Sequence, residues 1–374
     1  FGSSSPYAAQ SGKINARRRS TMTSSKAHFH VVGDALVDVL ATDLDDMPCW
    51  EGEANASSIS MQAGGSAFNT AIHLASLVEA TTSGDEVAMH GCVGADGMAS
   101  LLRARLRAAG VRDCLSEEPS GLSTGSCIVL SGSGRRAFIT SAGAASALTM
   151  AQIQALYSCL EEAAAEDKFH VHFGGFYSYS SELRSGIPAL VRELREKAEV
   201  QRVVFSTSVD VNGSLPQHVE GLLDALAEID IYKGNAEEGL AALLGSSNGN
   251  NVPMGVKGSP AHLAETLAAV RPGGNLSVVI TCGSEGAVYH TNESKGQVSA
   301  APLQAVVDGT GAGDACAAGL LASLKGRHAV SLQEALLRGC AAGSVNCTRK
   351  GGSMEPVTPE EVDSMLASMP GSRK

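Results

Sequence analysis

The segment 308–314 reads Asp-Gly-Thr-Gly-Ala-Gly-Asp and carries the strongest chemical signal in the sequence. It follows an extended stretch, 301–307, and precedes an apolar stretch that is typical of a helix. Its glycines let successive backbone N–H groups converge at a helix N-terminus, which favours binding of a phosphate or a developing anion. A carboxylate in that position can act as a general base towards an attacking alcohol. An aspartate at a helix start can also be only a cap, so other residues must decide between the two roles.

At this segment the sequence resembles the ribokinase-like (PfkB) carbohydrate kinase family, whose C-terminal signature is D-T-x-G-A-G-D. The resemblance extends over roughly residues 28 to 356 and includes further motifs in the expected order. The stretch 64–70, Gly-Gly-Ser-Ala-Phe-Asn-Thr, is similar to the N-terminal signature, in which a double glycine is followed by a small residue and an asparagine. The stretch 33–38, Gly-Asp-Ala-Leu-Val-Asp, is similar to the first strand and its following acid.

The resemblance implies roles for individual residues on the side of the phosphoryl acceptor. Asp314 is expected to be the catalytic base, and the anion hole is expected to comprise Gly311, Ala312 and Gly313. The glycine pair would let the backbone approach the substrate and would act as a hinge for a lid. The residues expected to bind substrate are Asp38, Gly64, Gly65 and Asn69.

Two further motifs are expected on the nucleotide side. Asn235-Ala236-Glu237-Glu238 resembles the N-x-x-E element of the family, so Asn235 and Glu238 are expected to organise Mg²⁺ and phosphate. Thr281-Cys282-Gly283-Ser284-Glu285-Gly286 is similar to the T-x-G-x-x-G turn, so Thr281, Gly283 and Gly286 are expected to bind the nucleotide. The resemblance therefore implies ATP and Mg²⁺ as cofactors, and it leaves room for a monovalent cation such as K⁺.

The sequence departs from the family pattern at two positions. Gly309 stands where the family usually has threonine, which is expected to loosen that loop and any nearby monovalent-cation site. Cys340 stands at a position that often carries a nucleotide-contacting asparagine. Both departures concern the nucleotide side and leave the expected base and anion hole in place.

The composition excludes several other functions. The chain of 374 residues has a formal net charge of −11, which disfavours binding to nucleic acid or to an anionic membrane surface. No apolar run approaches the roughly 20 residues of a membrane span. The nine cysteines stand singly without C-x-x-C spacing, which indicates a reducing compartment, and we expect a cytoplasmic protein. Residues 1–27 are rich in serine and arginine and lack acidic residues, so organelle import or a disordered tail both remain open.

The elements that must position these motifs alternate between strands and helices from residue 28 onwards. This alternation predicts an α/β, Rossmann-like fold with a mostly parallel central sheet and helices on both faces. Two regions, about 41–62 and 120–145, do not fit the alternation and predict a small β-sheet lid, through which a homodimer could form. The predicted kinase domain spans 28–360, and 361–374 is expected to be a C-terminal tail.

Two pairs of histidines, His28 with His30 and His170 with His172, have H-x-H spacing on predicted strands. Alternating residues of a strand share one face, so each pair could bind zinc. No acidic or cysteine partner stands nearby in the sequence, and we expect partly buried strand-end histidines instead.

The resemblance thus predicts transfer of the γ-phosphoryl group of ATP to a hydroxyl, expected to be primary, of a small molecule. The low aromatic content of 4% favours a sugar, whereas an aromatic pocket around Trp50 would favour a nucleoside. A nucleoside kinase of the same family and a catalytically silent regulatory relative both remain alternatives.

Overall fold

The computed structural model describes residues 26–79, 84–132, 135–164, 167–197, 203–208, 221–244, 259–271, 273, 275–324 and 330–369. The predicted N-terminal segment therefore lies outside the described residues, except for Lys26 and Ala27.

A large sheet forms the centre of the molecule, and its strands follow one another across the sheet in an order that differs from the chain order. That order is β13 (Lys295–Val298), β12 (Ala287–His290), β11 (Ser277–Thr281), β10 (Ile231–Asn235), β9 (Val203–Ser208), β8 (Lys168–Phe173), β1 (Ala27–Val32), β4 (Glu86–Val93) and β5 (Arg112–Glu117). Pairing is parallel from β5 to β11 and antiparallel from β11 to β13. The inner strands are almost wholly buried because both faces of the sheet are covered.

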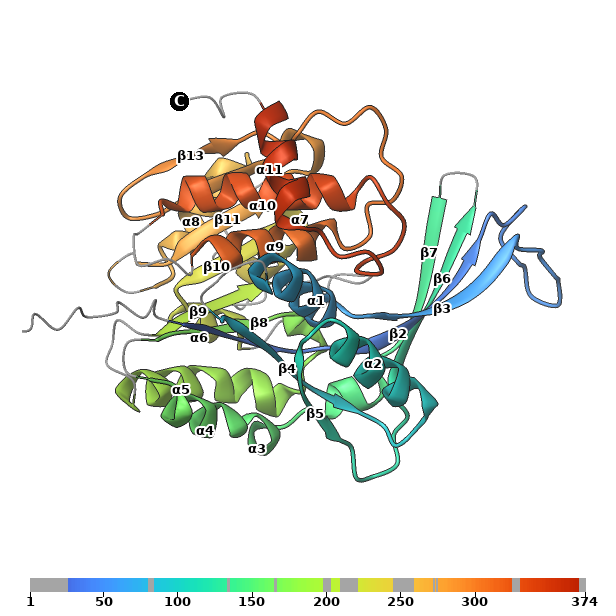
Figure 1. Cartoon of the computed structure of the whole chain (residues 1–374), viewed down its shortest axis with the longest axis horizontal. Coiled ribbons are helices and arrows are strands. Elements are labelled where there is room, and N and C mark those ends of the chain that lie inside the picture. The colour runs from blue at the N-terminus through green and yellow to red at the C-terminus, as the bar shows by residue number, and fades with distance from the viewer. Residues whose placement is uncertain are drawn as a thin grey trace, which may run out of the picture.

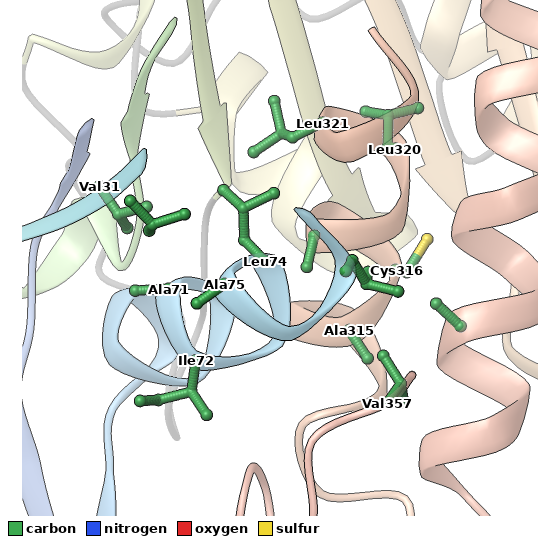
Figure 2. Packing of buried hydrophobic residues seen from close by; sticks show 14 of the residues in the cluster. Val31, Ala71, Ile72, Leu74, Ala75, Ala315, Cys316, Leu320, Leu321 and Val357 are labelled. Atoms are coloured by element: carbon green, nitrogen blue, oxygen red, sulfur yellow. The ribbon is translucent and has the colours of Figure 1, made fainter. Parts of the chain in front are cut away.

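One face of the sheet packs against the first helices and the last helices of the chain, whose apolar residues form one core with those of β1 and β4 (Figure 1). These helices are α1 (Ser66–Glu79), α2 (Gly97–Ala108), α9 (Ala312–Ser323), α10 (Leu332–Asn346) and α11 (Pro359–Ser368). Figure 2 shows Leu74 and Ala75 of α1 in the same apolar cluster as Ala315, Cys316 and Leu321 of α9. This packing fixes the N-terminus of α9 relative to α1, although the two helices are far apart in the sequence.

The other face packs against the helices from the middle of the chain, which form a second core with β8, β9 and β11. They are α3 (Met150–Ile153), α4 (Ala155–Glu162), α5 (Ser181–Lys197), α6 (Leu222–Leu226), α7 (Ala236–Leu244) and α8 (Pro260–Ala268). Short 3₁₀ turns at Gly143–Ala147, Phe176–Ser178 and Gly283–Glu285 complete the described elements. The helical stretch before β8 is divided, because Gln154 ends α3 and α4 starts after it.

A small second sheet projects from the rim of the large one (Figure 1). Its strands lie in the order β3 (Ser58–Gly64), β2 (Leu36–Thr42), β6 (Gly125–Gly132) and β7 (Arg135–Ser141). The β2–β3 and β6–β7 pairs are antiparallel, and β2 and β6 are parallel. The sheet thus starts at Leu36, five residues before the region in which the sequence placed the lid, and it includes Asp38.

The predicted fold class, a mostly parallel α/β sheet with helices on both faces and a small additional sheet, is confirmed. The described chain stays folded beyond residue 360, where the sequence placed the start of a tail. Helix α11 continues to Ser368, and its Val362 is buried in the first core, as is Met369. Within the described residues, no helix is both long and apolar enough to span a membrane.

Candidate active site

The N-terminus of α9 lies at the centre of the site. Helix α9 starts at Ala312, directly after Gly311, and no side chain caps its first turn. Gly311 has a left-handed backbone with φ of 74°, and a Cβ there would lie 2.5 Å from the carbonyl oxygen of Gly352. Only glycine satisfies both conditions, so the turn that aims the helix N-terminus depends on this residue.

The backbone amides of this turn are those that the sequence predicted as an anion hole. Among the described residues, the N–H groups of Gly311 and Gly313 have no protein acceptor, whereas that of Ala312 donates to the Gly309 carbonyl at 3.3 Å. Free N–H groups at a helix N-terminus, with the helix dipole behind them, form a site that suits a phosphate group. The amides of Gly311 and Gly313 are thus available to a ligand, and the amide of Ala312 makes only a long hydrogen bond.

Asp314 lies in the first turn of α9 and is held by the N-terminal turn of α1. The Ser66 hydroxyl donates to its Oδ1 at 2.9 Å, and the Asn69 side-chain amide donates to its Oδ2 at 3.1 Å. These bonds fix the orientation of the carboxylate beside the free amides. The structure therefore brings Asp314 and Asn69 into direct contact, and it adds Ser66, to which the sequence analysis gave no role.

Asn69 is buried and its side-chain oxygen is also bonded, accepting from the Ser353 hydroxyl at 2.7 Å. His73, one turn further along α1, donates from Nε2 to the Gly352 carbonyl at 2.7 Å and accepts from the Val357 N–H at 3.2 Å. Its pKa is lowered to about 4, mainly by burial, so the ring is neutral and this tautomer follows from its partners. Asn69 and His73 thereby tie α1 to the loop that follows α10.

Asp34 explains why α1 starts where it does. Its carboxylate accepts hydrogen bonds from the N–H groups of Ser66 and Ala67, both at 3.0 Å. A buried carboxylate is stabilised in this position by the free amides and the positive end of the helix dipole. Asp34 follows β1 directly, so this contact connects the central sheet to the helix that holds Asp314.

Asp38 lies on β2 of the small sheet and is the group whose ionisation is most clearly perturbed near the site. Its pKa is raised to about 7, first by desolvation and then by the negative charge of Asp34. Gly64 lies diagonally across from it on β3, and a Cβ there would be 2.1 Å from Asp38 Oδ2. Gly65, with φ of 102°, is equally restricted, because a Cβ would lie 2.7 Å from the Asp34 carbonyl oxygen. The predicted substrate residues Asp38, Gly64 and Gly65 are thus in mutual proximity.

Gln62, a neighbour of Asp38 in the small sheet, is a polar residue that the sequence analysis missed. The register pairs it with Asp38 across β2 and β3, which places both side chains on one face of the small sheet. Gln62 is buried, and its Oε1 has no hydrogen-bond partner among the described residues. A buried acceptor without a partner is costly, which marks it as a candidate for a contact with a bound molecule.

Asp308 closes the loop in front of α9. Its Oδ1 accepts from the Thr310 N–H at 2.7 Å, and its Oδ2 accepts from the Gly351 N–H at 3.1 Å. The Thr310 carbonyl in turn accepts from the buried Asn346 amide at 2.7 Å. A Cβ at Gly309 would meet no atom within 4 Å, so the departure at this position does not disturb these bonds.

Lys233 on β10 is a second residue that sequence reasoning missed, because it carries no motif of its own. It is buried, and its Nζ lies 3.1 Å from the position that a Cβ of Gly313 would take. The pKa of Cys316 is lowered mainly by its hydrogen bond with Cys340, and the positive charge of Lys233 adds to this. Burial lowers the pKa of His172 to about 3, and Lys233 contributes there as well. A buried ammonium group thus lies against the turn that bears the free amides.

The residues predicted on the nucleotide side are grouped at the ends of β10 and β11. Asn235 and Thr281 are register partners, and the Thr281 hydroxyl donates to the Gly234 carbonyl at 3.3 Å. Asn235 and Glu238 bond each other reciprocally at the start of α7: the Asn235 side-chain amide donates to Glu238 Oε1 at 2.7 Å, and the Glu238 N–H donates to Asn235 Oδ1 at 2.9 Å.

The glycines of the turn after β11 differ in what constrains them. A Cβ at Gly286, with φ of 97°, would lie 2.0 Å from the Val298 carbonyl oxygen, so this glycine is required by the fold. Gly283 has φ of 57° and open space around it. Gly283 therefore leaves the backbone accessible, whereas the conformation of Gly286 is explained by the pairing of β12 with β13.

The fit of Mg²⁺ can be judged from the oxygen donors. Among the described residues, no cluster of three or more acidic, histidine or cysteine side chains could hold a metal ion by itself. Mg²⁺ commonly keeps several waters and binds through one or two carboxylates plus substrate phosphates. A carboxylate such as Glu238, at the start of α7, fits this mode of binding, and an all-protein metal site does not.

Cys340 is one of the buried residues of α10. It is buried on the side of α10 that packs against α9, where its thiol forms a hydrogen bond with that of Cys316. The two helices approach closely, since a Cβ at Gly339 would lie 2.8 Å from the Cys316 carbonyl oxygen. The side chain at position 340 therefore takes part in the packing of α10 against α9.

Comparison with known proteins agrees with this geometry. Residues 26–358 match the model of the pfkB family carbohydrate kinases. The Arabidopsis thaliana protein named Probable fructokinase-7 is 35% identical over 96 residues, which cover 24% of this chain and 28% of the relative. The match thus spans less than a third of that relative's length.

Solved structures extend the likeness over nearly the whole chain. A ribokinase from Giardia lamblia has a TM-score of 0.74 at 20% identity and covers 92% of this chain and 99% of its own. Arabidopsis thaliana ribokinase complexed with ribose and ATP has a TM-score of 0.68 at 18% identity and covers 91% of this chain and 98% of its own. At these identities the structures show the fold, and the family follows from the sequence match. The resemblance seen in the sequence motifs is confirmed, and the chain belongs to the pfkB family of carbohydrate kinases.

Proposed function

We propose that the protein transfers the γ-phosphoryl group of ATP to a hydroxyl, most simply a primary one, of a sugar, with Asp314 as the general base. The observation that carries the proposal is the position of Asp314. Ser66 and Asn69 hold its carboxylate directly beside the free amides of Gly311 and Gly313. A base and an anion site in one helix turn are what an alcohol needs to attack a phosphoryl group.

On the phosphoryl side, the amides of Gly311 and Gly313 would donate hydrogen bonds to the transferred group. Lys233 would add a positive charge next to Gly313. Such fixed donors and charges stabilise the charge that develops during transfer. Mg²⁺, bound to the phosphates near Glu238, would neutralise part of their charge. The oxygens of Asp308 and Thr310 already accept N–H groups, so we assign no role to K⁺ in this loop.

On the acceptor side, Asp38 and Gln62 would accept hydrogen bonds from substrate hydroxyls, and the glycine pair would let the backbone approach. The side chains that contact Asp314 and Asp38 are small or polar, which favours a sugar over a nucleobase. Trp50 would have favoured a nucleoside if it lined an aromatic pocket, but its side chain is 98% exposed.

The test is turnover by the Asp314→Asn variant. It should lose about 10²- to 10⁴-fold in kcat while still binding ATP, because the base is removed and the anion site is kept. The matched control is Asp363→Asn, an exposed carboxylate on α11 that pairs with Arg338. Undiminished phosphoryl transfer by Asp314→Asn would exclude the proposed role.

The acceptor is identified by ADP release with a panel of pentoses, hexoses and nucleosides. Turnover with nucleosides alone would support the nucleoside kinase alternative. Absence of turnover with every acceptor, in folded protein that binds ATP, would support the silent relative instead.

We also propose that the outer face of the small sheet joins two copies of the chain. The register aligns Met61, Val39, Ile128 and Ile139 in one row on the face opposite Asp38, and three of these side chains are exposed. An apolar row of this kind is typical of an interface. Light scattering should report a dimer for the wild type and a monomer for Ile139→Lys, and a monomeric wild type would refute the proposal.

A further inference from the structure

A second cavity lies at the edge of the large sheet where β1 and β4 begin, whereas the candidate active site lies where the strands end. It has a volume of about 230 Å³, and its wall includes His30, Ala88, Arg112, Cys159 and Glu162. We call it the basal cavity. None of these residues takes part in the chemistry proposed above.

The strand register explains why the cavity exists. His30 on β1 pairs with Ala88 on β4, and Ala88 pairs with Arg112 on β5. The three side chains therefore share one face of the sheet, with the smallest between two long ones. His30 and Arg112 are two strands apart, or roughly 10 Å. The short side chain of Ala88 leaves space between them, and α4 covers it with Cys159 and Glu162.

His30 presents a hydrogen-bond donor to this space. His30 is only 4% exposed, and its Nδ1 lies 2.9 Å from Nε2 of His90. The second nitrogen of His90 is buried without a partner, and a buried N–H without an acceptor is rarer than a buried lone pair without a donor. His90 therefore donates from Nε2 to His30, and the proton of His30 is on Nε2. Among the described residues, no protein acceptor meets that N–H.

Arg112 supplies a positive charge to the basal cavity. Within the described chain, no carboxylate lies within ion-pairing distance of its guanidinium group. The pKa of His30 and that of His90 are lowered mainly by burial, and the charge of Arg112 contributes to both. The other cation of the wall, Lys26, is already paired with Glu86, which also lies 3.6 Å from His28. Arg112 and His30 thus offer donors from two sides of one cavity, and both suit an oxyanion.

We propose that the basal cavity binds a small oxyanion, a phosphate monoester or a carboxylate, between the Arg112 guanidinium and the His30 Nε2–H. Glu162 on the rim has a carboxylate that opposes an anion, so its removal should strengthen binding. Opposite effects of Arg112 and Glu162 distinguish a site of this chemistry from general binding to the surface.

The test is calorimetric titration with inorganic phosphate and, separately, with malonate, at constant ionic strength. The variants are Arg112→Gln and Glu162→Gln, and the matched control is Arg192→Gln, an exposed arginine that pairs with Glu228. Any binding at the active site is common to all four proteins and cancels in the comparison. Arg112 is exposed at the start of β5, so its substitution should leave the fold intact.

We expect one of the two anions to bind about tenfold more weakly to Arg112→Gln and more tightly to Glu162→Gln, with Arg192→Gln like the wild type. The anion that shows this pattern identifies the ligand as a phosphate or a carboxylate. The bound anion should also slow alkylation of Cys159, which lines the cavity. Equal affinities in the wild type and Arg112→Gln for both anions, or no binding of either, would overturn the proposal.

Discussion

Replacing Asp38 with asparagine tests the electrostatics of the site most directly, because it keeps the shape of the side chain and removes its charge. The pKa of Asp38 is raised from 3.8 to about 7 by burial and by Asp34. A carboxyl group that is raised in this way binds a proton more tightly in the folded chain than in the unfolded chain. Stability must therefore fall as the pH rises from about 4 to about 7.

The size of the effect follows from the shift. A rise from 3.8 to about 7 corresponds to about 4 kcal/mol of unfolding free energy when Asp38 is fully ionised. Asp38→Asn should therefore be more stable than the wild type at pH 8, by up to about 4 kcal/mol, and should gain little at pH 4. The measurement is urea unfolding at both pH values, with Asp45→Asn, an exposed carboxylate after β2, as the control.

The same variant tests the role of Asp38 in binding. Substrate hydroxyls donate hydrogen bonds to the ionised carboxylate, so substrate binding should release a proton below pH 7. The KM of the wild type for the acceptor should fall as the pH rises from 6 to 7, by up to about tenfold. Asp38→Asn should have a raised KM without this dependence. A variant that is no more stable at pH 8 than at pH 4, relative to the wild type, would refute the reasoning.

Two further substitutions probe the acceptor side and the phosphate side. Gly64→Ala places a methyl group 2.1 Å from Asp38 Oδ2, so it should displace the carboxylate and raise the acceptor KM by at least about tenfold, while Gly97→Ala, whose methyl group meets no atom, should not. Lys233→Met removes the cation below Gly313 and should lower kcat by about 10- to 100-fold, with the acceptor KM unchanged; a raised acceptor KM at normal kcat would contradict its placement on the phosphate side.

Some features of the site could be predicted from the sequence because their physical cause is local. The left-handed turn at Gly311 and the helix that starts after it follow from a few consecutive residues. The hairpin of β6 and β7 likewise follows from two extended runs around a glycine-rich turn. The apolar stretch that follows residue 314 likewise predicts a helix, which the structure shows as α9.

Other features depend on contacts between distant segments, which one sequence does not reveal. Ser66 and Asp314 are 248 positions apart, and their hydrogen bond exists only because α1 packs against α9. Lys233 looks like an ordinary strand residue in the sequence, and only the fold shows that its Nζ lies close to Gly313. Both residues belong to the chemistry proposed for the site, and both were found from the fold.

The basal cavity is a second case in which contacts between distant segments could not be predicted from the sequence. The H-x-H spacing correctly placed His28 and His30 on one face of a strand, and it suggested a metal site only because the spacing was judged along the chain. Across the sheet, the row that starts at His30 continues with Ala88 and Arg112, neither of which ligates zinc, and Nδ1 of His30 is already bonded to His90. The N–H of His30, the space over Ala88 and the guanidinium group of Arg112 lie in one row and form a site for an anion. The partners across the strands, and not the motif itself, therefore decide which ligand the histidine can serve.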